Sequence, residues 1–76
     1  MTTTCHIRIF RCAAGIGYAL YIRTGTGPVT VVPARRGRMD VAYAVRAGTA
    51  AAVARGIAPA AVTATFAGAP VAVPVG

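Results

Sequence analysis

The chain has 76 residues, of which 57% are hydrophobic and 12% are charged, and its net charge is +7. This length allows one domain and excludes two, and so small a domain buries only about 60% of its unfolded surface. We therefore expect a single small basic domain over residues 1–76, with apolar surface left for a partner in a homo-oligomer or a tight heterocomplex.

The first half of the chain predicts three strands. Alternating apolar and polar side chains indicate strands at residues 6–12 and 18–24, and a third strand is expected at residues 29–32. Glycine-containing turns separate the three strands, and Pro33 ends the pairing of the third. Residues 34–38, with the sequence ARRGR, are expected to form a basic loop.

One helix is expected over residues 40–55. Asp40 is a good N-cap residue, and Gly56 stands where a helix ends. Gly48 costs up to about 1 kcal/mol inside a helix relative to alanine, and close packing against the sheet would explain its presence. The expected packing stripe consists of Val41, Val45 and Ala52.

The last third of the chain predicts two more strands. Residues 62–66 alternate, with Val62, Ala64 and Phe66 directed inward, and residues 67–70 form a turn. A final short strand is expected at residues 71–75, where prolines confine it to an edge or to irregular structure. The order β-β-β-α-β-β predicts an α+β fold, a two-layer sandwich of a mostly antiparallel sheet and one helix.

Residues suited to catalysis are few, since the chain has no serine and no glutamate. Cys5 and His6 are neighbours on the first expected strand and point to opposite faces, while His6 and Cys12 share a face about 20 Å apart. The spacing of these three residues matches no standard zinc pattern. We expect no enzyme, no metal, no cofactor and two reduced thiols, which fit a cytoplasmic protein.

No membrane segment is expected. Residues 57–76 carry no charge, but Pro59, Pro70 and Pro74 forbid a regular spanning helix there. Residues 12–22 loosely resemble a signal peptide, yet cleavage after them would leave too little chain to fold.

All the positive side-chain charge is arginine, and Asp40 is the single acid. Arginine without lysine, together with abundant alanine, valine and glycine, indicates a GC-rich genome, so the total charge means more than any single arginine. At most one arginine can pair with Asp40. The others need water, backbone carbonyls or an external anion, which favours nucleic acid, an acidic protein surface or anionic lipid.

One face of the first expected hairpin combines basic and aromatic side chains. If Ile7 and Ile9 face the helix together with Tyr18, Leu20 and Ile22, the opposite face carries His6, Arg8, Phe10, Tyr21 and Arg23. Binders of single-stranded nucleic acid stack bases on such rings, at about 1–3 kcal/mol each, and hold phosphates with guanidinium groups. The alternative is an ordinary solvated face or one covered by a partner subunit, and a one-residue slip in register would redistribute the rings.

A second candidate site is the expected basic loop. Arg35, Arg36 and Arg38 immediately precede the helix, whose unpaired N–H groups and dipole favour an anion. Asp40 opposes this, because its side chain uses one N–H group and adds negative charge. The alternative is a solvated loop in which one arginine pairs with Asp40.

These features favour a non-enzymatic module that docks through an arginine-rich surface onto nucleic acid or onto a nucleic-acid-handling complex. A chain of this size and composition suits a phage or another mobile element, where it could inhibit a host defence nuclease. The alternative is a structural subunit of a symmetric assembly such as a virion. Salt separates the two, because only electrostatic binding weakens steeply with added salt.

Overall fold

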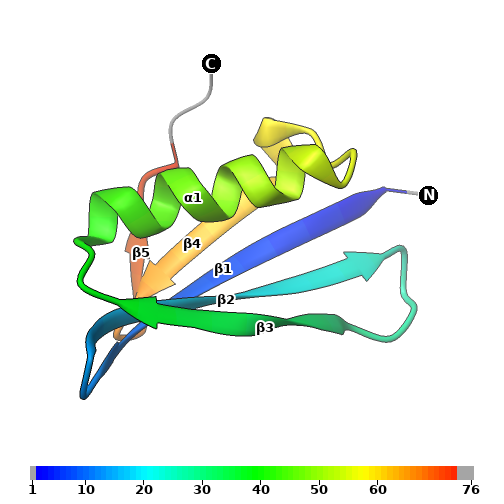
Figure 1. The fold of residues 1–76 in the computed structure, drawn as a ribbon. Coiled ribbons are helices and arrows are strands. Elements are labelled where there is room, and N and C mark those ends of the chain that lie inside the picture. Colours follow the sequence, from blue (N-terminus) through cyan, green and yellow to red (C-terminus); the bar gives the residue numbers. More distant parts are fainter. Residues whose placement is uncertain (1, 74–76) are drawn as a thin grey trace.

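A computed structural model describes residues 2–73, in which one helix lies across one face of a five-stranded sheet (Figure 1). The elements are β1 (Thr3–Cys12), β2 (Gly15–Thr24), β3 (Thr30–Gly37), α1 (Val41–Ala54), the 3-10 helix η1 (Pro59–Ala61), β4 (Val62–Phe66) and β5 (Ala69–Val71). The predicted order β-β-β-α-β-β and the two-layer α+β architecture are confirmed.

The sheet has the strand order β3-β2-β1-β4-β5. Three neighbouring pairs are antiparallel, and β1 and β4 are parallel. The parallel pair arises because α1 crosses the sheet between β3 and β4 and returns the chain to the other side of β1 (Figure 1). The sheet is therefore mixed but mostly antiparallel, as predicted.

The core lies between α1 and the sheet, in the predicted register. Ile7 lies opposite Leu20 and Ile9 opposite Tyr18, and all four side chains are buried. The helix contributes a buried stripe to the same layer: Ala44, Val45, Gly48 and Ala52. In the described residues these side chains form one contiguous cluster with Val62 and Ala64 of β4.

Gly48 is the point of closest approach between helix and sheet. A Cβ atom at this position would lie 2.8 Å from Cδ1 of Ile7, a side chain that is fully buried. Close packing therefore explains the glycine inside the helix, as predicted.

Both ends of α1 are as the sequence predicts. The backbone N–H of Tyr43 donates to Oδ1 of Asp40 at 2.7 Å, which caps the first turn. Gly56 has φ +82, the left-handed conformation that ends a helix with little strain only at glycine, and its N–H donates to the carbonyl of Val53.

Replacement of the cap tests this helix start. Asp40→Ala is expected to lower the free energy of unfolding by about 0.5–2 kcal/mol, because the N–H of Tyr43 loses its acceptor. Asp40→Asn keeps an acceptor and is expected to lose much less. Thermal melting monitored by circular dichroism distinguishes the two; equal losses would mean that the charge of Asp40, and not the cap, is what stabilises the helix.

The predicted basic loop at residues 34–38 is wrong, because β3 continues to Gly37. Leu20 pairs with Val32 and Tyr18 with Arg35, so β3 has two residues, Pro33 and Ala34, where β2 has one. This bulge takes Pro33 into an edge strand without a break in the sheet, since the proline has no N–H to donate to the ladder.

The final strand is also displaced from its predicted place. It runs over Ala69–Val71, and only Ala67 and Gly68 separate it from β4. Both have positive φ, +51 and +84, as a two-residue type I′ hairpin turn requires. Pairing therefore resumes directly at Ala69; part of the predicted strand, residues 74–75, lies outside the described residues.

Within residues 2–73, no helix has the length and apolar character needed to cross a bilayer.

Candidate functional site

The face of the sheet turned away from α1 has no covering layer among the described residues (Figure 1). We call it the open face. Side chains alternate along a strand, so the residues of β1 that flank the buried Ile7 and Ile9 point to the open face. Their partners in β2 point to it as well. Three cross-strand pairs lie there: His6–Tyr21, Arg8–Ala19 and Phe10–Gly17. The structure thus places four predicted site residues, Arg8, Phe10, Tyr21 and Arg23, on one surface.

The open face is hollowed into a shallow depression of about 470 Å³, here called the trough. Its lining consists of Arg8, Phe10, Arg11, Ala19, Tyr21, Val31, Ala34 and Arg36. It is hollow because Ala19 has a small side chain and lies opposite the bulge in β3, while larger side chains rise around it.

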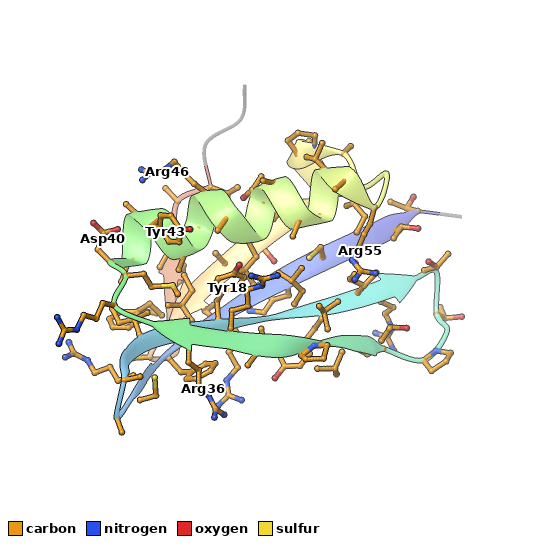
Figure 2. All side chains as sticks on the ribbon, viewed as in Figure 1. Tyr18, Arg36, Asp40, Tyr43, Arg46 and Arg55 are labelled. Carbon is orange, nitrogen blue, oxygen red and sulfur yellow. The ribbon has the colours of Figure 1, made fainter. Side chains whose placement is uncertain are left out.

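Phe10 packs against the sheet and lines the trough. A Cβ atom on Gly17 would come within 2.8 Å of two ring carbons of Phe10, so the ring occupies the space that a side chain at Gly17 would need. The guanidinium carbon of Arg36 lies 5.8 Å from the centroid of the same ring. Figure 2 shows Arg36 on the side of the sheet away from α1. The Phe10 ring therefore rests on the backbone at Gly17 and is contacted by the guanidinium of Arg36, an exposed side chain.

His6 borders the open face toward β4 and is hydrogen-bonded through both ring nitrogens. Its Nδ1 lies 2.7 Å from Oγ1 of Thr63, and its Nε2 lies 3.0 Å from Oγ1 of Thr65. These two bonds fix the imidazole across the β1–β4 pair, beside Arg8 and Tyr21.

The arginines of the open face differ in how their charge is used. Arg8 and Arg36 are exposed and line the trough. Arg11 alternates with Phe10 and so leaves β1 on the other side, but it borders the trough at the end of the strand, and its guanidinium carbon lies 5.4 Å from the ring centroid of Phe66. Arg23 lies outside the trough, where its Nε donates to the carbonyl of Gly27 at 3.0 Å.

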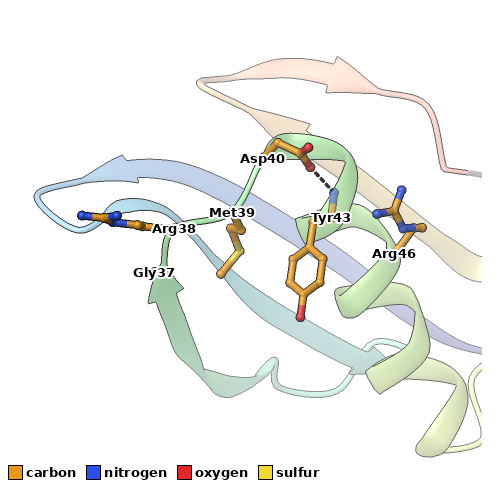
Figure 3. A pocket seen from close by; sticks show the side chains of 6 residues that line it. All are labelled: Gly37, Arg38, Met39, Asp40, Tyr43 and Arg46. Carbon is orange, nitrogen blue, oxygen red and sulfur yellow. Dashed lines mark hydrogen bonds between the residues drawn. The ribbon is translucent and has the colours of Figure 1, made fainter.

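The three arginines that the sequence groups in one loop are separated in the structure. Arg35 and Arg36 are adjacent on β3, so Arg36 belongs to the open face while Arg35 is in register with Tyr18, on the helix side. Arg38 follows the strand and points away from the start of α1 (Figure 3). The grouping fails because the segment is a strand, whose neighbouring side chains diverge.

The hollow at the start of α1 is a poor anion site. It is lined by Gly37, Arg38, Met39, Asp40, Tyr43 and Arg46 (Figure 3). Asp40 places its carboxylate here and already accepts from the N–H of Tyr43. The helix N-terminus is thus capped from within the chain, and an external anion would meet a negative charge.

Sequence reasoning missed the residues that shape the trough: Arg11, Gly17, Ala19, Val31 and Ala34. Small residues give no signal of their own in a sequence. The available signal is their alternation with Tyr21 along β2, which places Gly17 and Ala19 on the face that Phe10 shares.

Cys5 is buried on the helix side of β1, whereas its neighbour His6 borders the open face. Burial raises the pKa of the Cys5 thiol, an effect that the positive charge of Arg55 opposes in part. Cys5 and Cys12 are separate free thiols. Within residues 2–73, no three of the side chains His, Cys, Asp and Glu lie together in a way that could hold a metal ion.

Comparison with known protein families, characterised proteins and solved structures finds no significant match to this chain.

Proposed function

We propose that this chain is a non-enzymatic module that binds nucleic acid on its open face, in the trough. The observation that supports this is the trough's lining, which combines three arginines with two aromatic rings on an uncovered sheet surface. Guanidinium groups suit phosphates and aromatic rings suit bases, so the one surface offers complementary groups for both parts of a nucleotide.

The charge of the whole chain favours the same kind of ligand. Eight arginines share one acidic side chain, and that acid already accepts the N–H of Tyr43 at the start of α1. Nothing acidic in the sequence can neutralise Arg8, Arg11 and Arg36 together. A polyanion would, and it would release counterions as it bound.

If the chain belongs to a phage or another mobile element, the same basic surface would also suit an acidic patch on a host defence nuclease complex. The trough's charge fits either anionic surface, but its flat ring and its small-residue floor favour a nucleotide. Nucleic acid is therefore the first proposed ligand, and an acidic surface of a host defence nuclease complex is the alternative.

The test compares two double variants that remove equal charge. Arg8→Ala/Arg36→Ala and Arg46→Ala/Arg55→Ala each lower the net charge from +7 to +5, and all four side chains are exposed. The probe is a fluorescein-labelled single strand of about 12 nucleotides, as DNA and as RNA, titrated at several salt concentrations. The open-face variant is expected to bind at least about tenfold more weakly, with a salt slope reduced by about 0.7 for each lost phosphate contact.

The helix variant is expected to bind within about twofold of the parent, since α1 lies on the other side of the sheet. Equal weakening of both variants would show that binding depends on overall charge alone. A parent protein that binds neither DNA nor RNA would overturn the proposed function.

A structural subunit of a symmetric assembly is the second candidate, favoured by Val29 and Val31, which are 48% and 56% exposed beside the sheet edge. Pairing of that edge with another copy is opposed by Pro33 and the bulge, devices that protect edge strands. Sedimentation of the purified protein in low and high salt tests this: apolar assembly persists in salt, and a monomer in both would exclude it.

A further inference from the structure

We propose that the trough selects single-stranded over duplex nucleic acid, and that Phe10 is the residue on which a base stacks. This inference rests on the proposed function and makes it more specific. It follows from the shape of the open face, from the way the Phe10 ring is held, and from the spacing of the two rings.

The open face is too wide to read a duplex. Five strands at about 4.8 Å spacing make a surface about 19 Å across, whereas the major groove of B-DNA is about 12 Å wide. The helix would fit that groove, but its exposed residues within α1 are mainly alanine and valine, with Arg46 as the only basic side chain. The open face has the basic side chains but is too wide to enter the groove, and the helix would enter it but carries a single basic side chain within α1.

The Phe10 ring is held against the sheet, beside an exposed arginine. One side of the ring rests on Gly17, with 2.8 Å between two ring carbons and the place of a Cβ atom, and Arg36 approaches the ring at 5.8 Å. The ring also lines the trough. A base that stacks on the ring takes the place of the Arg36 guanidinium, which belongs to an exposed side chain and can move aside. A nearby guanidinium adds a contact for the adjoining phosphate.

The second ring lies too far away for the neighbouring base. Phe10 is paired with Gly17, and Tyr21 lies four residues further along β2, or about 13 Å. Stacked neighbours in a duplex are about 3.4 Å apart, so consecutive stacked bases cannot contact both rings. A single strand with separated bases can. Arg8, opposite Ala19, lies midway between the rings, where the connecting backbone would pass.

The experiment uses labelled single-stranded DNA and RNA of about 12 nucleotides and the matched DNA duplex as probes. The parent is expected to bind a single strand at least about tenfold more tightly than the duplex. Phe10→Leu keeps an apolar side chain over Gly17 and is expected to weaken single-strand binding about 5- to 150-fold, the loss of one stacked base. Its salt slope is expected to remain that of the parent, because no charge is removed.

Two further variants keep the test decisive. Tyr43→Leu removes a ring that is 51% exposed on α1 and is expected to bind like the parent. Phe10→Tyr retains a ring and is expected to retain binding within about twofold, which separates stacking from mere folding. Duplex bound as tightly as single strand, or Phe10→Leu bound like the parent, would overturn this inference and leave the proposed function standing. Absence of binding to every probe would overturn the proposed function itself.

Discussion

Gly48→Val is expected to destabilise the fold by about 1–3 kcal/mol or more, the range for overpacking a well-filled core. A Cβ atom at Gly48 would lie 2.8 Å from Cδ1 and 3.1 Å from Cγ1 and Cγ2 of Ile7. Ile7 has 0% of its surface exposed and sits in the central strand, so it has no space into which to retreat. The helix would have to move away from the sheet, and the single core would open with it.

The matched control is Ala50→Val, at an exposed position of the same helix. Valine is a poorer helix former than alanine but a better one than glycine. If propensity alone decided stability, Gly48→Val would stabilise the protein and Ala50→Val would weaken it slightly. We expect the opposite order: a melting temperature lower by about 5–20 °C for Gly48→Val, and a change of at most a few degrees for Ala50→Val. A Gly48→Val protein that melts at or above the parent temperature would contradict the packing described above.

The parts of this fold that the sequence predicts correctly are those set by strong local signals. Asp40 and Gly56 bound the helix because a side-chain acceptor and a left-handed residue are needed at those two positions. The apolar alternation through Ile7, Ile9, Val62 and Ala64 fixes which face of the sheet is buried. Once that face is known, the opposite face follows, and the register of β1 and β2 places Arg8, Phe10 and Tyr21 on it.

The errors lie where long-range pairing overrides a local signal. Pro33 normally ends a strand, yet β3 runs through it, because the bulge opposite Ala19 accommodates a residue without an N–H. The Ala67–Gly68 turn has alanine where a type I′ hairpin usually has asparagine or aspartate. Alanine has no preference for positive φ, so the sequence does not indicate this turn. Both features depend on the neighbouring strand, which a single sequence does not display.

For the same reason, the sequence predicts arginines and aromatic rings of the candidate site but not its hollow shape. Charged and aromatic residues stand out in a sequence, whereas a hollow forms where small side chains are surrounded by larger ones. Ala19 creates the trough through its small size and through its position opposite the bulge. Arg36 lies on this surface and Arg35 does not, because β3 continues past Pro33 and neighbouring side chains of a strand point to opposite faces. The sequence predicts that pairing ends at Pro33.

Ala19→Leu is expected to abolish most nucleic-acid binding while leaving every charge in place. Ala19 forms the floor of the trough between Phe10 and Tyr21, and a leucine there would fill the space between the two rings. A strand held off the floor loses both stacking contacts, each worth about 1–3 kcal/mol, so affinity for the single-stranded probe should fall by about a hundredfold or more. Ala19 is only 7% exposed, because side chains of the open face surround it, so the leucine would displace those side chains. It points away from the core between α1 and the sheet, so we expect a smaller drop in melting temperature than for Gly48→Val.

The informative comparison for Ala19→Leu is Ala50→Leu, the same substitution at an exposed position of α1. Both proteins keep the net charge of +7, so a model in which any basic surface attracts a polyanion predicts equal binding by the two. The trough predicts that only Ala19→Leu loses affinity. Equilibrium titrations with the labelled single strand, together with melting curves for both proteins, decide between these alternatives. If Ala19→Leu folds and binds like the parent, the ligand does not enter the trough, and the exposed arginines act as a diffuse electrostatic surface instead.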